Sequence, residues 1–155
     1  MLSISEFAVG DVAEAAVGSL ILPRSERQRP GLVGMVDDTP FFVFLSHEHN
    51  YGACKKSVRL RNPGIVVPNV QIEVDERSIG EYDPWQTRAG AFVIDDGKAG
   101  VLAGDPQTPG LARFVVNVLD VAKSEITAAF SRWQIVVGSA QDRRVLLTID
   151  TTASA

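Results

Sequence analysis

The most constraining feature of this sequence is the regular spacing of apolar residues between positions 108 and 133. They recur every three or four positions, at Leu111, Phe114, Val115, Val118, Ala122, Ile126, Ala129, Phe130 and Trp133. This spacing is typical of one face of an α-helix. A polar stripe recurs at the same interval, at Arg113, Asn117, Asp120, Ser124, Thr127 and Ser131. Thr108 and Pro109 are typical of a helix start, so the pattern predicts one long helix over about 109–132.

Most of the remaining chain is typical of antiparallel β-structure. Three pairs of apolar segments surround turn-forming residues and predict hairpins, at 32–36 with 41–45, 92–95 with 98–103, and 134–137 with 143–149. The middle hairpin has Asp96-Gly97 at its tip, a dipeptide that favours a tight type I′ turn. Alternating residues predict further strands at 57–61 and 70–74, whereas 77–88 has no period and predicts a long connection.

Together these patterns predict an α+β fold. A predominantly antiparallel, hairpin-rich and bent sheet would pack against the long helix, and a final β-hairpin would follow that helix. The length of 155 residues, of which 45% are hydrophobic, predicts a single globular domain over residues 1–150. Residues 151–155 are predicted to form a frayed tail.

Composition excludes several functional classes. The formal net charge of −4 argues against a surface built to bind nucleic acid. No apolar run approaches the roughly 20 residues of a membrane span. The single cysteine, Cys54, cannot form an intramolecular disulfide, which favours a cytoplasmic location. No glycine pattern typical of a phosphate-binding loop is present, and we expect no cofactor.

The two histidines of the chain are the sharpest candidates for chemistry. His47 and His49 follow the predicted strand at 41–45, and on an extended backbone positions i and i+2 share a face. Two imidazoles placed in this way could ligate zinc or iron. The available third ligands are Cys54, Glu48 and one of Asp37 and Asp38. The alternative is that both histidines are solvated residues of a polar loop.

Cys54 is a candidate nucleophile. It precedes Lys55 and Lys56, whose ammonium groups would favour the thiolate. His47 or His49 would act as its base if the side chains approach within hydrogen-bond distance. The alternative is a structural cysteine.

Two further groups of residues are candidates for binding. Arg59 and Arg61 project from one side of the predicted strand at 57–61 and could bind a phosphate or carboxylate, or pair with acidic residues of a neighbouring strand. Tyr82 and Trp85 lie in the predicted long connection. Aromatic residues in polar loops either anchor a partner or fold back onto the core.

The sequence favours a small soluble binding or interaction domain that is not catalytic, with a protein or small molecule as its partner. A metal- or cysteine-dependent enzyme built around His47, His49 and Cys54 is the alternative. Because hairpin-rich sheets have edges that must be paired, covered or charged, a homo-oligomer formed through a sheet edge is a third hypothesis. The predicted last strand, at 145–149, is the candidate edge.

Overall fold

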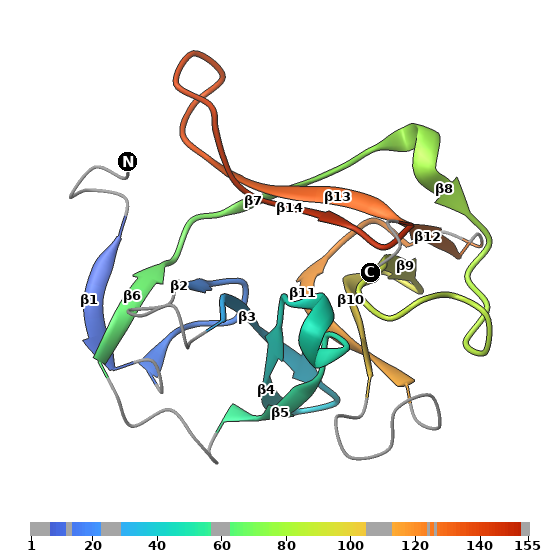
Figure 1. The fold of residues 1–155 in the computed structure, drawn as a ribbon, viewed down its shortest axis with the longest axis horizontal. Helices are drawn as coiled ribbons and strands as arrows, with labels where there is room; N and C mark the ends of the chain where they lie inside the picture. The colour runs from blue at the N-terminus through green and yellow to red at the C-terminus, as the bar shows by residue number, and fades with distance from the viewer. Residues whose placement is uncertain are drawn as a thin grey trace.

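The fold consists of β-strands joined by turns and loops (Figure 1), in a computed structural model that describes residues 7–11, 14–22, 29–56, 63–104, 113–123, 125 and 127–152. The larger of two sheets has 11 strands. Its strands follow in space as β1 (Ala8–Asp11), β6 (Pro63–Val67), β2 (Leu20–Leu22), β3 (Gly31–Val36), β11 (Arg113–Asp120), β10 (Lys98–Gly104), β9 (Phe92–Asp95), β12 (Ala128–Phe130) and β8 (Ile79–Gly80). Beside β3, β4 (Thr39–Phe44) and then β5 (Ala53–Lys55) extend this sheet.

A second sheet of three strands lies across the larger one in Figure 1, in the order β14 (Arg144–Asp150), β13 (Arg132–Val137) and β7 (Gln71–Val74). Its buried residues Trp133 and Ile135 belong to the same hydrophobic core as Leu32, Val101 and Val116 of the larger sheet. The two sheets therefore form two layers around a shared core. All pairings between the described strands of both sheets are antiparallel.

At one corner of the structure, the chain crosses twice from one sheet to the other. There β12 is followed by β13 after Ser131, and β7 is followed by β8 through the 3-10 turn Glu76–Ser78. Ser78 connects the two crossings, because its hydroxyl accepts the backbone N–H of Arg132 at 3.0 Å and its carbonyl accepts that of Ser131 at 3.3 Å. The corner is thus fixed by hydrogen bonds where the regular sheet pairing ends.

The three predicted hairpins are confirmed. β3 pairs with β4, β9 with β10, and β13 with β14. The tight turn at Asp96-Gly97 has φ of 45° and 80°, the positive values that a type I′ turn requires. The strand predicted at 70–74 is β7, whereas the one predicted at 57–61 lies outside the described residues.

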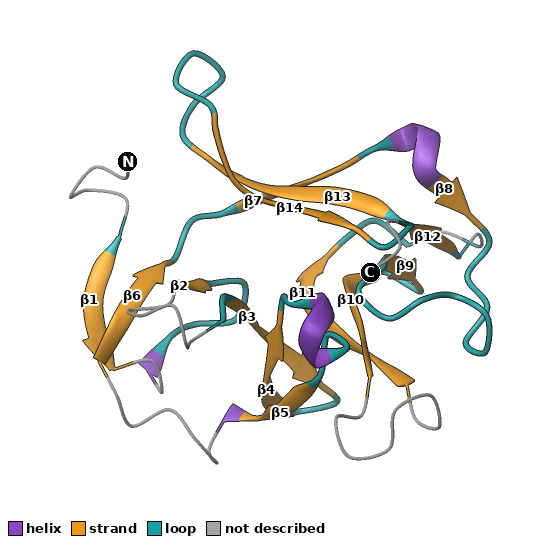
Figure 2. Ribbon diagram, viewed as in Figure 1, coloured by secondary structure: helices purple, strands orange, loops and turns teal. Residues whose placement is uncertain are grey.

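The prediction of an α+β fold with a long helix over about 109–132 is wrong. Within that range the structure has β11 and β12, and β13 begins at Arg132. Figure 2 shows helical segments only as short turns in the part of the chain that the structure describes. None of the described helices is long and apolar enough to span a membrane. The fold class is all-β and antiparallel.

The reason is that β11 has apolar residues on both of its faces. Phe114, Val116 and Val118 contact the core between the sheets, while Val115 packs on the other face against the cluster that contains Val93. A strand covered on both faces has an almost continuous apolar run, whose periodicity does not distinguish it from a buried helix. β-Branched residues such as these valines favour the strand.

Val116 tests this correction, because it is absent from the apolar face of the helix that the sequence predicted. In the strand it is fully buried, whereas Leu119 is 37% exposed. We expect Val116→Ala to lower the free energy of unfolding by about 2 kcal/mol. Leu119→Ala should cost about 0.5 kcal/mol. Urea denaturation of both variants measures the difference, and equal losses would contradict the strand assignment.

An ion pair across the three-stranded sheet predicts a second effect. Arg143 donates to both carboxylate oxygens of Glu73, with Nε to Oε1 at 2.8 Å, and Gln134 donates to Oε2 at 2.9 Å. These bonds, that of Arg143 above all, lower the pKa of Glu73 from 4.5 to about 2. The folded state therefore holds its proton less tightly than the unfolded chain, so the stabilisation is complete above pH 4.5 and is lost as the pH falls toward 2.

We accordingly expect Arg143→Gln to reduce the loss of stability that the protein shows between pH 5 and pH 2. Arg77, which is exposed on the 3-10 turn, provides the matched control in Arg77→Gln. Urea midpoints at a series of pH values measure the effect. An Arg143→Gln profile parallel to that of the unmodified protein would refute the assignment.

Candidate functional site

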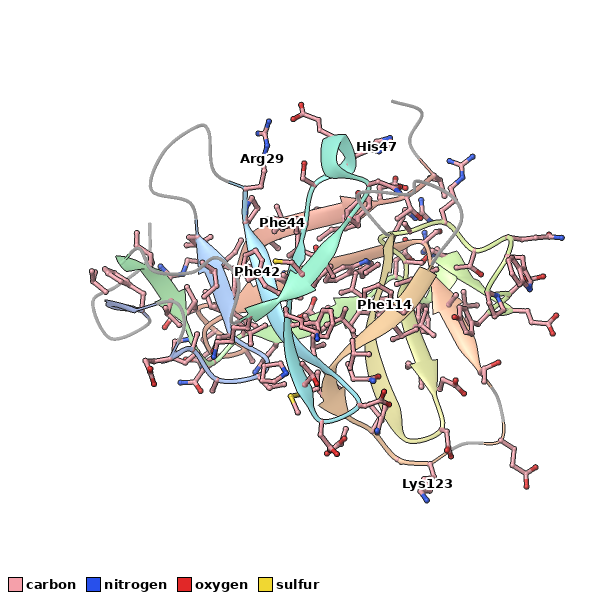
Figure 3. The ribbon with its side chains drawn as sticks, turned by 90° about the horizontal axis from the view of Figure 1, so that it is seen from below. Arg29, Phe42, Phe44, His47, Phe114 and Lys123 are labelled. Carbon is pink, nitrogen blue, oxygen red and sulfur yellow. The ribbon has the colours of Figure 1, made fainter. Side chains whose placement is uncertain are left out.

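The first histidine lies on a short turn at the end of β4. His47–His49 forms a 3-10 turn, not the extended backbone expected from the sequence. Because such a turn has about three residues per revolution, positions i and i+2 do not share a face. His47 is exposed, and Figure 3 shows it on the same side of the molecule as Arg29, which pairs with Glu48. The side chain of His49 lies outside the described part of the structure.

The turn is followed by two residues in the left-handed region. Asn50 has φ of 50° and Tyr51 has φ of 47°, which is a strained backbone for an aromatic residue. Tyr51 is only 8% exposed, and its ring stacks on His47 with 6.3 Å between centroids and 9° between planes. Burial of the ring compensates for the strained backbone.

Tyr51 also fits closely against the loop 81–91, which connects β8 to β9. Its ring lies over Gly90, where an added Cβ would come within 2.5 Å of the ring atom Cε2. Gly90 has φ of +92°, so both space and backbone conformation require glycine there. The 47–51 turn and the 81–91 loop are therefore packed directly on each other.

Two pockets lie beside this contact, and Arg88 and Thr151 line both. We call the smaller one, of about 230 Å³, the Arg88 pocket; it is lined by His47, Asn50, Tyr51, Arg88, Ala89, Asp150 and Thr151. The larger one, of about 370 Å³, lies at the corner between the sheets and is lined in part by Ser78, Glu81 and Ser131. Arg88 is held between them, because its Nη1 donates to the carbonyl of Thr151 at 3.0 Å.

The environment of the Arg88 pocket keeps the hydroxyl of Tyr51 protonated. Burial raises the pKa of Tyr51, and the negative charge of Asp150 raises it further. Tyr51 can therefore donate a hydrogen bond in this pocket at neutral pH.

Cys54 does not line either of these pockets. It lies on β5 opposite Phe42 of β4 and packs against the cluster formed by Ala15, Ile21, Val33, Phe42 and Val66. Among the described residues, no three side chains of His, Cys, Asp or Glu gather closely enough to hold a metal ion. The structure thus brings His47 into a pocket and places Cys54 in a separate apolar cluster.

The remaining candidates differ in how the structure places them. Arg59 and Arg61 lie outside the described residues. Tyr82 is half-buried and packs against Val93, Leu102 and Ala129. Trp85 is 82% exposed. The two aromatic residues of the loop therefore differ in their environment. Tyr82 packs the loop on the core, whereas Trp85 points into solvent.

The segment 81–87, which we call the Trp85 loop, is held by its own hydrogen bonds. The carboxylate of Asp83 accepts the backbone N–H of Trp85 at 2.8 Å and that of Gln86 at 3.3 Å. The hydroxyl of Thr87 accepts the N–H of Asp83 at 2.9 Å, and the N–H of Thr87 donates back to the Asp83 carbonyl at 2.8 Å. Trp85 is consequently presented on a closed turn.

Sequence reasoning missed Arg88 and Asp150 and gave no role to Tyr51. A weak signal existed for Arg88, which is a basic residue in the long connection next to the Ala89-Gly90 step. No sequence signal pointed to Asp150, because an acidic residue at the end of an alternating strand is usually solvated. Only the folded chain brings residues 51, 88 and 150 to one pocket.

The fold and the site define an all-β domain of two antiparallel sheets, with pockets and an exposed tryptophan on the loops around one corner. The chain belongs to the family described as "Uncharacterised protein y4lG", whose model matches residues 9–155. It is 38% identical over 149 residues to "Uncharacterized protein y4lG" of Sinorhizobium fredii (strain NBRC 101917 / NGR234), covering 94% of this chain and 91% of that protein. No solved structure matches it significantly.

The protonation of Tyr51 is directly measurable, because the chain has only two tyrosines. We expect absorbance titration near 295 nm to show one tyrosine that ionises above pH 10 and is missing in Tyr51→Phe. Asp150→Asn should lower that pKa only in part, since burial is the larger cause. Tyr82→Phe is the control, which should leave the late transition in place. Two tyrosines that titrate together near pH 10 would contradict the assignment.

Proposed function

We propose that this protein is a non-catalytic binding domain that engages a protein partner through the Trp85 loop. The observation that carries the proposal is the 82% exposure of Trp85 on a hydrogen-bonded turn. A large aromatic side chain in water gains free energy when a partner buries it, and tryptophan is enriched among the residues that dominate interface energies.

The rigidity of the Trp85 loop supports this function. Its hydrogen bonds from Asp83 and Thr87, and the packing of Tyr82 on the core, order the backbone before any partner arrives. Ordering a loop at the moment of binding costs conformational entropy, which a preorganised loop largely avoids. The arrangement is therefore suited to presenting one anchor residue.

The charges around Trp85 indicate the chemistry of the partner. Glu81 is exposed and Asp83 is partly exposed in the same short segment, and the whole chain carries a net charge of −4. A complementary surface would have an apolar pocket for the indole, with Lys or Arg at its rim. We expect this interaction in the cytoplasm, since the chain has only one cysteine.

The enzymatic alternative has less support from the geometry. A cysteine nucleophile needs a base within hydrogen-bond distance. Here His47 lines the Arg88 pocket, whereas Cys54 packs against the cluster around Phe42. A binding role does not require His47 and Cys54 to approach each other.

Self-association through a sheet edge stays a prediction. β14 is an outer strand of the three-stranded sheet, and Val145 on it is 44% exposed. The register shift in the pairing of β13 with β14, between Ile135 and Val136, interrupts the regularity of that edge. Because such bulges oppose edge-to-edge pairing, we rank this hypothesis below a heterologous partner. Light scattering at tens of micromolar tests it, and a monomeric mass would reject it.

The Trp85 proposal is tested by affinity capture followed by measurement with the purified partner. Proteins retained by the unmodified domain and lost with Trp85→Ser are identified, and their affinity is measured by calorimetry. We expect Trp85→Ser to weaken binding by at least about 2 kcal/mol, roughly 30-fold. Val145→Ser, which removes another exposed apolar side chain, is the matched control and should bind normally.

Two outcomes would contradict the Trp85 proposal. If Trp85→Ser retains the same proteins with unchanged affinity, or if Val145→Ser loses them to the same extent, the Trp85 loop is not the binding surface. Circular dichroism of both variants confirms that each retains the β-fold.

A further inference from the structure

β8 forms one outer edge of the larger sheet (Figure 1). It pairs with β12, and none of the described strands pairs with its other side. The backbone N–H of Ser131 donates to the carbonyl of Ser78 at 3.3 Å, so these two residues form a hydrogen-bonded pair of the antiparallel ladder. Because hydrogen-bonded and non-hydrogen-bonded pairs alternate, the carbonyl of Ile79 faces away from β12. Ile79 is also 58% exposed, so β8 presents a backbone acceptor and an apolar side chain at this edge.

The second residue of β8, Gly80, is not required by packing within the described chain. An added Cβ there would meet no heavy atom within 4 Å, whereas at Gly34 and Gly100 of the same sheet it would come within 2.5 Å and 2.0 Å of Val116. The φ of Gly80 does not lie in the left-handed region either. A strand glycine that neither backbone conformation nor internal packing requires is consistent with the close approach of another backbone.

Gly80 lines the pocket at the corner between the sheets, which has a volume of about 370 Å³ and which we call the corner pocket. The buried residues Ala91 and Ala129 line it as well. Glu81 and Thr87 of the Trp85 loop complete this part of the lining. The corner pocket is therefore continuous with the loop that presents Trp85, and it has room for a side chain of a partner.

The charges of this surface are acidic on the side of the Trp85 loop. Between Ile79 and Trp85 the charged residues are Glu81 and Asp83, of which the first is exposed and the second partly exposed. Lys or Arg side chains of a partner would be attracted to these carboxylates. Inside the corner pocket the charges of Glu81 and Arg88 oppose each other, so the pocket itself is better suited to an apolar side chain.

We propose that the Trp85 loop engages an extended, basic peptide segment, which continues along β8 and places one apolar side chain in the corner pocket. This inference rests on the function proposed above and adds the chemistry of the partner. The segment would donate a backbone N–H to the carbonyl of Ile79 and lie close to Gly80, as in peptides that add a strand to the edge of a sheet. Its cationic side chains would lie opposite Glu81 and Asp83.

The probe is a phage-displayed library of random peptides of about 12 residues, long enough to cross a sheet edge, selected on the purified full chain. We expect the selected peptides to share a large apolar residue flanked by Lys or Arg. One of them is then synthesised, and its Kd for the full chain is measured by calorimetry.

Variants of the chain then place the peptide. Gly80→Val meets no atom of the described chain and favours the strand, but it occupies the space beside the corner pocket. We expect it to weaken binding at least about tenfold, because the peptide backbone can no longer approach. Thr148→Val, at an exposed position of β14, is the matched control and should bind normally.

The charge contribution is tested in the same way. Glu81→Gln should weaken binding about threefold and reduce its dependence on salt, as expected for an exposed ion pair. Asp38→Asn, which removes an exposed carboxylate from the turn between β3 and β4, should change neither. Circular dichroism confirms that each variant keeps the β-fold.

Trp85→Ser separates this inference from the function on which it rests. Weaker peptide binding with both Trp85→Ser and Gly80→Val supports the two together. If Trp85→Ser alone weakens binding, the Trp85 loop stands and the site at β8 and the corner pocket is overturned. If Gly80→Val alone does so, the peptide site at β8 stands and the Trp85 proposal is overturned. A library that yields no peptide sensitive to Gly80→Val also overturns the inference.

Discussion

The arrangement of the loops depends on the burial of one tryptophan between the sheets. Trp133 of β13 is 2% exposed, its indole packs on Phe92 of β9 with ring centroids 5.3 Å apart, and its Nε1–H donates to the carbonyl of Gly90 at 2.8 Å. One side chain thus connects the three-stranded sheet, the larger sheet and the 81–91 loop. A buried indole without an acceptor would leave an unsatisfied donor, so the loop and the core require each other.

The same residue, Gly90, receives contacts from two directions. Its carbonyl is held by Trp133, while Tyr51 covers the position where a side chain would stand. The strained backbone of Tyr51 is maintained by this packing, because its ring is buried in the core that also contains Trp133. The 47–51 turn, the 81–91 loop and β13, which are distant in sequence, therefore pack together as one unit. Arg88 lies two residues before Gly90, so the packing of this unit also positions Arg88.

Local sequence signals explain part of this structure. The Asp-Gly turn at Asp96-Gly97 and the alternation of β7 depend on neighbours along the chain, and sequence reasoning identified both correctly. The prediction of a helix over the long strand β11 was wrong, because the neighbouring residues Val115 and Val116 place apolar side chains on opposite faces of the strand, so that no simple apolar and polar alternation marks it. The Arg88 pocket could not be predicted from the sequence, because it also depends on contacts between distant segments. Asp150 becomes a neighbour of Tyr51 only when β14 crosses the larger sheet, and no local pattern encodes that crossing.

The 81–91 loop is also joined to the end of β14. Nη1 of Arg88 donates to the carbonyl of Thr151 at 3.0 Å, just beyond the last residue of β14. The Trp85 loop within that segment does not depend on this bond alone, because it is also held by its own hydrogen bonds and by the packing of Tyr82 on the core.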